Sequence, residues 1–309
     1  TNRRMDQPRV IAVTGASGLV GRALTAELQT RGCTVRRLVR RAVQDTAAEI
    51  AWDPAAGTID AAAMEGVDGV VHLAGENVAD GRWTEAKKRR IVDSRVDGTR
   101  LISQTIAQLA GKPAVLVSAS AIGFYGDRGA EPVDEDAPAG TGFLADTSRA
   151  WEAETRPAWE AGVRVVQVRV GLVLTPEGGL LAKMLPLFKL GLGGVLGDGR
   201  QYMSWITRRD LVRAFCFALE SDALHGAVNG VAPGAVTNRE FTRTLGAVLG
   251  RPTVLPAPRF ALKLAMGQMA DQMILAGANV VPARLAEAGF SFEDPELAGA
   301  LRRLLKPGV

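Results

Sequence analysis

Cysteine and histidine are scarce in this sequence of 309 residues, and each shortage excludes a class of site. The two cysteines, Cys33 and Cys216, lie far apart in the chain. No disulfide framework is therefore expected, and a reducing compartment, the cytoplasm, is the expected location. The two histidines, His72 and His225, are equally isolated, and together with the cysteines they offer no metal-ligand spacing. The sequence therefore predicts no metal site.

Long apolar runs are also missing. The most apolar stretch, Leu180–Leu196, still carries two lysines, and Thr1–Arg9 has no apolar core of the kind that a secretion signal needs. The net charge is +4, but the basic residues fall in short clusters, such as Arg36–Arg41 and Lys87–Arg90, without interleaved aromatic residues. We therefore expect neither a membrane partner nor a nucleic-acid partner.

The clearest positive signal is a strand, a glycine turn and a helix at the start of the chain. The apolar run Val10–Val13 ends at Thr14, and glycines follow at positions 15, 18 and 21, before the amphipathic run Leu19–Arg31. Glycines at this spacing permit a sharp turn, close approach of backbone to a pyrophosphate, and tight packing of helix on strand. The free N–H groups at the helix start attract the anion. An ordinary glycine turn is the alternative. The residues predicted to hold the cofactor here are Gly15, Ala16, Ser17, Gly18, Leu19, Val20 and Gly21.

Apolar runs typical of strands alternate with helical segments along the chain. The expected strands are Val10–Val13, Thr34–Val39, Gly69–Leu73, Ala114–Ser118, Val163–Val170 and Ala227–Val231, and the expected helices include Gly18–Arg31, Thr84–Leu109 and Asp146–Ala161. This alternation predicts an α/β fold with a doubly wound parallel sheet, in which ligands bind beyond the carboxyl ends of the strands. Leu73, Ala74, Gly75 and Ser118 are therefore further candidates for cofactor contacts.

A change of composition divides the chain. Glycines interrupt the segment after Leu174, and prolines punctuate a helical segment after Pro252. We predict a Rossmann-like cofactor domain of residues 8–175 with 204–232. A smaller, mostly helical lobe of residues 176–203 and 233–309 would shape the substrate pocket.

The residues after the second strand predict which dinucleotide binds. An acidic residue there accepts hydrogen bonds from the ribose 2′-hydroxyl of NAD, whereas an arginine holds the 2′-phosphate of NADP. This chain has Arg40 and Arg41 at that place and no carboxylate before Asp45. We predict NADP(H), with Arg40 the first candidate and Arg41 the second, and a solvated basic loop as the alternative.

These stretches together resemble the extended or atypical short-chain dehydrogenase/reductase family. The motifs that carry the resemblance are Thr14–Gly21, His72–Gly75, Ser118–Gly126 and Trp205–Leu211. Four further stretches resemble the sugar nucleotide epimerase-like subfamily, which has a small carboxy-terminal domain: Gly75–Asn77, Arg82–Thr84, Asp93–Val96 and Gly289–Phe292. The resemblance covers nearly the whole chain.

The family's usual proton relay is missing. The resemblance implies a catalytic tyrosine with a lysine four residues later, near Ala145–Asp146 and Arg149–Ala150, but the only tyrosines are Tyr125 and Tyr202 and no lysine occurs from Pro113 to Ala182. Ser120 aligns with the family's catalytic serine. Tyr125 is a candidate substitute acid, with packing in its loop as the alternative.

Other polar residues near the expected site have two interpretations each. Asn77, Arg82, Trp83 and Arg95 could shape a substrate pocket, or they could serve core packing and surface ion pairs. We expect the acidic stretch Asp127–Asp136 to be a solvated loop, with a rim beside the active site as the alternative, and His72 to pack inside its strand.

Two functions remain open from the sequence. The first is an NADP(H)-dependent oxidoreductase or epimerase that acts on a nucleotide-sugar or another small hydroxylated or carbonyl substrate. The second is a cofactor-binding regulatory or scaffolding protein that has lost catalysis, as the missing tyrosine and lysine suggest. The resemblance also implies a dimer through helices Thr84–Leu109 and Asp146–Ala161, although the apolar stripes of these helices could equally face the core.

Overall fold

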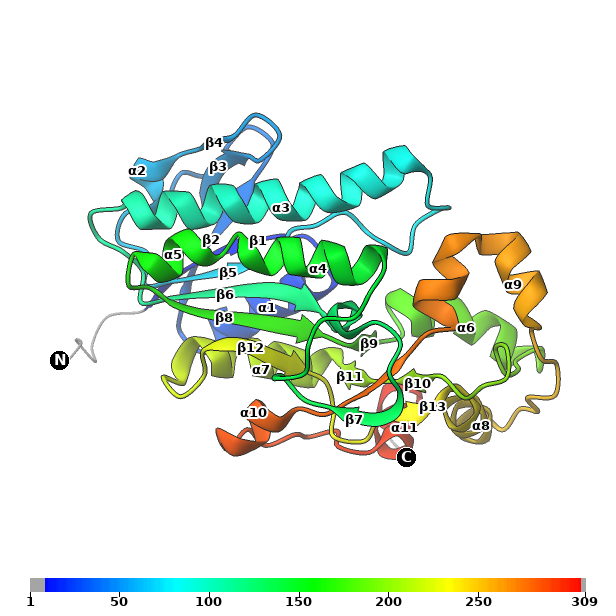
Figure 1. Cartoon of the computed structure of the whole chain (residues 1–309). Coiled ribbons are helices and arrows are strands. Elements are labelled where there is room, and N and C mark those ends of the chain that lie inside the picture. Colours follow the sequence, from blue (N-terminus) through cyan, green and yellow to red (C-terminus); the bar gives the residue numbers. More distant parts are fainter. Residues whose placement is uncertain (1–8, 307–309) are drawn as a thin grey trace.

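The computed structural model describes residues 9–306, and its centre is an eight-stranded sheet (Figure 1). The strands run in the order β12-β8-β6-β5-β1-β2-β3-β4. Their bounds are β1 (Val10–Thr14), β2 (Thr34–Val39), β3 (Glu49–Asp53), β4 (Thr58–Ile59), β5 (Gly69–His72), β6 (Val115–Ala121), β8 (Arg164–Val170) and β12 (Gly226–Gly230). All neighbouring pairs are parallel except β3 with β4. The predicted doubly wound, Rossmann-like sheet is confirmed.

Helices cover both faces of this sheet, which explains why the central strands β1, β5 and β6 are largely apolar. One face carries α3 (Glu85–Gln108), α4 (Phe143–Ala153) and α5 (Arg156–Glu160), and the short α2 (Ala61–Met64) follows β4. The other face carries α1 (Leu19–Thr30) and α7 (Arg208–Glu220). Figure 1 shows α3, α4 and α5 in front of the sheet. Two separate apolar cores fill the spaces: Ile102 and Ile106 of α3 belong to the first, and Leu24 of α1 with Phe215 of α7 to the second.

A smaller, mostly helical region lies beyond the carboxyl ends of the strands (Figure 1). Its helices are α6 (Gly179–Lys189), α8 (Asn238–Leu249), α9 (Arg259–Met266) and α11 (Leu297–Leu305), with a π-helical turn η2 (Ala270–Ile274). The short α10 (Ala283–Glu287) instead packs against β12 of the main sheet. Three small sheets connect it to the main one, and they pair β9 (Leu172–Leu174) with β11 (Trp205–Thr207), β10 (Tyr202–Met203) with β13 (Val236–Thr237), and β7 (Gly129–Val133) with β14 (Ala278–Val280). A third apolar core combines Leu181 of α6 and Phe241 of α8 with Trp205 of β11. The exact division of the chain into two domains stays a prediction.

Two local predictions were wrong. The helix expected over Asp146–Ala161 is two helices, because Pro157 lacks the N–H that a continuous helix needs and instead occupies the first turn of α5. The acidic stretch Asp127–Asp136 is not a simple solvated loop, since it contains β7, which pairs with β14, and the buried Glu135. The expectation that His72 packs inside its strand is confirmed, because its side chain is fully buried.

Among residues 9–306, none of the helices is long and apolar enough to cross a bilayer. The polar stretch Thr1–Arg9, in which we expected no secretion signal, lies outside the described residues except for Arg9.

Candidate cofactor site and the polar network beside it

The glycine turn after β1 has the close contacts that a phosphate cradle requires. Gly15 has a φ of +66°, which favours glycine, and a Cβ there would lie 2.9 Å from the carbonyl carbon of Leu73. A Cβ at Gly21 would lie 2.1 Å from the carbonyl oxygen of Gly15. Any side chain at Gly21 would therefore force α1 away from the turn. The absent side chains at these two positions let the turn pack directly against the end of β5 and let α1 start close to the turn, which is the tight geometry of a dinucleotide-binding turn.

Helix α1 begins with unused hydrogen-bond donors. Gly18 is its N-cap and provides no side-chain cap, and the first turn holds no acidic residue. Ser17 and Gly18 are exposed, and Arg22 donates to the carbonyl oxygen of Ser17 at 2.7 Å. The free N–H groups at this helix start and its partial positive charge suit an anion. The residues present therefore fit a dinucleotide.

Thr14 fastens β1 to the end of β5. Its hydroxyl accepts hydrogen bonds from the backbone N–H groups of Leu73 at 3.0 Å and Ala74 at 3.1 Å. Its own proton then goes to Nδ1 of His72, 2.8 Å away, which assigns the ring proton to Nε2. Burial lowers the pKa of His72 to about 4, and the nearby Arg95 adds to the effect. A neutral imidazole thus holds the turn that leads to Ala74 and Gly75.

The two arginines after β2 differ sharply. Arg41 forms a two-pronged ion pair with Glu49 of β3, one oxygen of which lies 3.0 Å from an Arg41 nitrogen. These hydrogen bonds, with one from the backbone N–H of Gln44, lower the pKa of Glu49 to about 2. Arg40 is exposed, and within the described residues no carboxylate lies within ion-pair distance of it. Both arginines line a hollow of about 340 Å³ that also touches Trp52, Asp53 and Asp60.

The four residues predicted to contact substrate all have partners within the protein. Asn77 accepts from the N–H of Ala79 at 3.0 Å, and the indole of Trp83 donates to the carbonyl oxygen of Val78 at 2.8 Å. Arg82 donates to the carbonyl oxygens of Leu264 and Ala265, near the end of α9. Arg95 donates to the carbonyl oxygens of Glu76 at 3.0 Å and Ile91 at 3.1 Å, and burial lowers its pKa to about 10.

Ser120 belongs to a buried charged network at the end of β6. Its hydroxyl donates to Glu152 of α4 at 2.6 Å. The same carboxylate receives two hydrogen bonds from Arg169 of β8, at 2.8 Å and 2.9 Å. The side chains of Glu152 and Arg169 are 10% and 5% exposed, so this is a buried ion pair. Ser118, one pleat earlier, is also buried, and its hydroxyl lies 3.3 Å from the Ala119 carbonyl oxygen.

Tyr125 lies in the same network and has no exposed surface. It ends the 3-10 turn η1 (Ile122–Tyr125), and its hydroxyl donates to Asn229 of β12 at 2.7 Å and accepts from Arg169 at 2.9 Å. Burial raises the pKa of Tyr125 above its usual range. The buried Glu135 accepts from the backbone N–H of Asn229 at 2.9 Å, and burial likewise raises its pKa. These contacts favour the packing interpretation of Tyr125 that the sequence left open.

The positions of the missing relay hold no substitute. Ala145 is buried, and Asp146 forms an exposed ion pair with Arg149 one turn later on α4. Ala150 is exposed. This stretch of α4 therefore offers no phenol and no ammonium group to the sheet edge.

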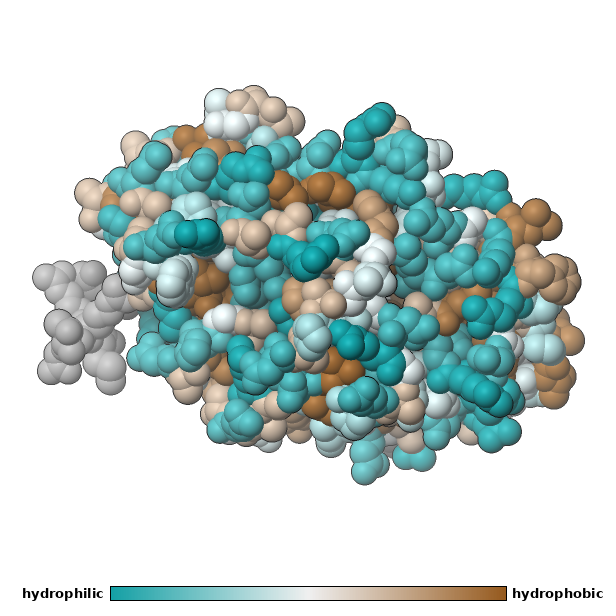
Figure 2. Space-filling model, in the orientation of Figure 1, coloured by the Kyte–Doolittle hydropathy of each residue, from teal (hydrophilic) through white to brown (hydrophobic). Residues whose placement is uncertain are grey.

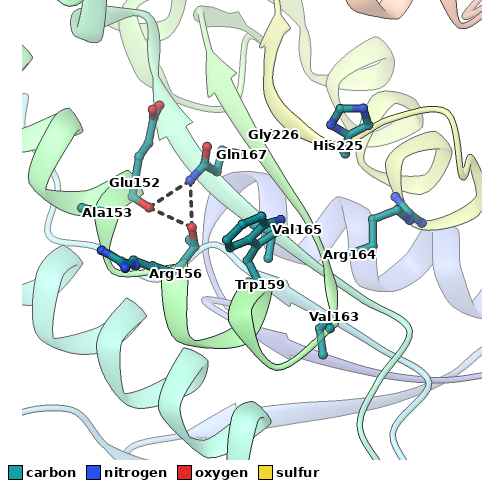
Figure 3. A pocket seen from close by; sticks show the side chains of 12 residues that line it. Glu152, Ala153, Arg156, Trp159, Val163, Arg164, Val165, Gln167, His225 and Gly226 are labelled. Carbon is teal, nitrogen blue, oxygen red and sulfur yellow. Dashed lines mark hydrogen bonds between the residues drawn. The ribbon is translucent and has the colours of Figure 1, made fainter.

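A larger hollow lies elsewhere, along α5 and the first halves of β8 and β12 (Figure 3). It measures about 740 Å³ and is lined by residues such as Trp159, Arg164 and His225. Figure 3 shows Gln167 pointing toward the helix, where its amide donates to the carbonyl oxygen of Glu152 at 2.9 Å and to the Thr155 hydroxyl at 2.8 Å. Since the groove is at the amino-terminal end of these strands, it is separate from the edge where the glycine turn lies.

Sequence reasoning missed Glu152, Arg169, Asn229 and Glu135. One signal was available, because Arg169 interrupts the apolar run Val163–Val170, and a charge inside a buried strand requires a partner. The partner itself, 17 residues away on another element, leaves no pattern in the sequence.

Comparison with known proteins gives consistent results. The model of the NAD dependent epimerase/dehydratase family matches residues 11–229, and a domain of unknown function, DUF1731, matches residues 257–304. The epimerase family protein MT2273 of Mycobacterium tuberculosis is 47% identical over 292 residues, which are 94% of this chain and 96% of that protein. The human epimerase family protein SDR39U1 is 35% identical over 298 residues, which are 96% of this chain and 99% of that protein.

Two solved structures are similar throughout this chain. The crystal structure of human SDR39U1 (isoform 2) with NADPH has a TM-score of 0.87 and 34% identity, and the match covers 96% of this chain and 98% of that one. A nucleoside-diphosphate sugar epimerase of Corynebacterium glutamicum has a TM-score of 0.79 and 36% identity, over 97% of this chain and 58% of that one. The glycine turn, the sheet order and these matches agree that this chain belongs to the NAD dependent epimerase/dehydratase family, with a carboxy-terminal DUF1731 domain, and has that family's NAD(P)-binding fold.

Proposed function

We propose that the protein binds NADP(H) in preference to NAD(H). The observation that carries the proposal is the contrast between Arg40 and Arg41: Glu49 occupies the guanidinium of Arg41, whereas Arg40 is exposed beside the hollow at the end of β2. A free guanidinium holds a phosphate with two parallel hydrogen bonds. The NADPH in the human relative's structure supports the same choice.

The cofactor contacts follow from the cradle. The turn Gly15–Gly21 would hold the diphosphate, with the N–H groups at the start of α1 as donors. Leu73, Ala74 and Gly75 would line the dinucleotide at the end of β5, with Ser118 behind them. Arg40 would hold the 2′-phosphate, and Arg41 would stay with Glu49 and position the loop.

The Arg40 role has a direct test with a matched control. Arg40→Asp should weaken NADPH binding about tenfold or more and change NADH binding little, because a carboxylate repels the 2′-phosphate. Arg41→Ala, which removes the neighbouring guanidinium, should change the NADPH/NADH preference much less. Equal losses for both cofactors in Arg40→Asp, measured by calorimetric titration, would contradict the assignment.

We further propose an oxidoreductase or epimerase that acts on a small hydroxylated or carbonyl compound, of which a nucleotide-sugar is one. When bound, the nicotinamide supplies or accepts hydride. Ser120 would orient a substrate oxygen only if its hydroxyl can break its hydrogen bond to Glu152. The pocket would be shaped by residues that fix the loop between β5 and α3, namely Asn77, Arg82, Trp83 and Arg95. With its hydroxyl held by Asn229 and Arg169, Tyr125 would position this edge rather than exchange protons.

A specific observation also favours the second candidate, a regulatory or scaffolding protein that binds NADP(H) without turnover. The stretch of α4 where the family has its tyrosine and lysine holds Ala145, an ion pair between Asp146 and Arg149, and Ala150. Incubation with NADPH and a panel of carbonyl compounds separates the two. Substrate-dependent loss of NADPH absorbance supports an oxidoreductase. Interconversion of nucleotide-sugar epimers in a parallel incubation supports an epimerase, because the hydride returns to the substrate and the cofactor shows no net change. Tight cofactor binding with neither outcome supports the regulator.

Location and assembly are part of the proposal. Both cysteines are free, which supports a reducing compartment, the cytoplasm. A dimer through α3, α4 and α5 would be tested by light scattering. Arg100 of α3 already pairs with Glu154, just after α4, at 2.7 Å, so these helices also hold one another.

A further inference from the structure

Exposed apolar side chains gather on one part of the lobe. Seven of the eight large hydrophobic side chains that stand exposed in the described residues fall within positions 187–192 and 254–264. They are Leu187, Leu190, Leu192, Val254, Leu255, Phe260 and Leu264, and we call them the lobe patch. The eighth, Trp159, lies on α5 in the groove described above. Scattered single exposed hydrophobic residues are normal, but a cluster of seven indicates contact with something apolar.

The two segments of the lobe patch run side by side. The backbone N–H of Ala257 donates to the carbonyl oxygen of Val195 at 2.9 Å, and a bridge joins Ala257 to Leu196. Helix α9 starts directly afterwards, at Arg259. Figure 2 shows brown and tan atoms along the edge of the molecule where Figure 1 draws α9.

Helix α9 lies on the surface of the protein and carries exposed apolar side chains on one face. It has no buried residue, and Phe260 and Leu264, one turn apart on one face, are 74% and 77% exposed. Arg259 and Lys263 stand beside them. Apolar residues on one side with basic residues next to them are typical of helices that lie in the interface of a bilayer.

Basic residues predominate in the two segments that carry the lobe patch, although Glu177, Asp198, Glu240 and Asp271 flank them directly. Residues 178–197 and 241–270 contain six basic residues and no aspartate or glutamate; the six are Lys183, Lys189, Arg243, Arg251, Arg259 and Lys263. Lys183 lies near Asp80 and Lys263 pairs with Asp271, both outside these segments. In residues 9–306, no carboxylate comes within ion-pair distance of Lys189, Arg251 or Arg259. The patch therefore presents positive charge around an apolar centre.

We propose that the lobe patch docks on the surface of an anionic phospholipid bilayer. The positive charges would face the headgroups, and Phe260, Leu264 and their neighbours would enter the acyl boundary. The basic residues beside an exposed apolar helix face complement an anionic lipid surface, and this favours lipid as the occupant. No helix of the described residues is long and apolar enough to span a membrane, so this contact would be peripheral; it departs from the sequence-based expectation of no membrane partner.

The test uses the full chain and vesicles of two compositions. We expect binding to phosphatidylcholine vesicles that contain about a third phosphatidylglycerol, weak binding to pure phosphatidylcholine, and loss of binding at high salt. The double variant Phe260→Ser with Leu264→Ser should lower the partition coefficient about tenfold or more. Trp159→Ser, which removes an equally exposed apolar side chain elsewhere, should leave it unchanged.

The contribution of the basic residues to vesicle binding is tested by one double variant in the lobe and one control variant outside it. Lys189→Glu with Arg251→Glu should weaken binding to anionic vesicles, whereas Arg302→Glu on α11 should not. The NADPH-induced shift in melting temperature checks that each variant is folded. Absence of wild-type binding to anionic vesicles would overturn the proposal, as would equal binding to both compositions. A dimer that the Phe260/Leu264 variant dissociates, without vesicle binding, would assign the patch to a second copy instead.

Discussion

The two halves of the sheet's carboxyl edge are built differently. Around β1, β2 and β5, the edge consists of backbone: a glycine turn, a helix start, and two N–H groups held by Thr14. Around β6, β8 and β12, it consists of side chains, because Arg169 links Glu152 to Tyr125. The first half leaves donors free for a ligand, whereas the second satisfies most of its own polar groups. The proposed cofactor site and the buried polar network therefore have separate structural bases in this chain.

The largest expected effect on stability and cofactor binding comes from the part of the edge around β1, β2 and β5, which we call the backbone half. Gly21→Val should destabilise the protein by about 3 kcal/mol or more and abolish cofactor binding, because its Cβ would lie 2.1 Å from the Gly15 carbonyl oxygen. Gly299→Ala on α11, where a Cβ would meet open space, should change the free energy of unfolding by less than about 1 kcal/mol and in the stabilising direction. Urea unfolding of both variants measures the difference; similar values would mean that the turn can relax around a side chain.

In the part of the edge around β6, β8 and β12, which we call the side-chain half, breaking the buried ion pair should destabilise the protein. Glu152→Ala leaves Arg169 without its carboxylate, and the expected loss of stability is about 3–5 kcal/mol. Glu160→Ala breaks an exposed pair with Arg156 on α5 and should cost less than about 1 kcal/mol. If Glu152→Ala proved as mild as Glu160→Ala in urea unfolding, the network would not hold this edge together.

Low pH should destabilise the backbone half, because unfolding lets His72 take up a proton. Burial lowers its pKa to about 4 from 6.5, so the unfolded chain binds a proton between these values and the folded chain does not. Stability is thus complete above pH 6.5 and falls as the pH drops toward 4, by up to roughly 3 kcal/mol. His72→Gln should flatten this part of the pH profile of unfolding, and His225→Gln should not. An unchanged slope in His72→Gln would contradict the burial argument.

The sequence was informative where function rests on local backbone. The glycine spacing and the apolar strands predicted the turn and the sheet, because each depends on residues close together in the chain. The place of the cofactor, inferred from the same glycines and from the arginines after β2, stays a prediction. The short edge strands β3 and β4 were not predicted, since they are brief and polar on one side.

Contacts between residues far apart in the chain could not be predicted, because no local sequence pattern indicates them. Glu135 lies in an acidic stretch whose composition is typical of an exposed loop. Only the fold brings its carboxylate to the backbone N–H of Asn229, 94 residues later. Arg40 and Arg41 look alike in the sequence, and only β3 distinguishes them by placing Glu49 beside the second. The roles of Ser120 and Tyr125 depend on such partners as well.

Calorimetric titration of the wild-type protein with NADPH and with NADH shows whether the backbone half of the edge binds NADP(H). We expect saturable heat with NADPH at one site per chain, and binding of NADH weaker by about tenfold or more. The absence of heat with either cofactor, together with an unmoved melting temperature, would contradict this expectation.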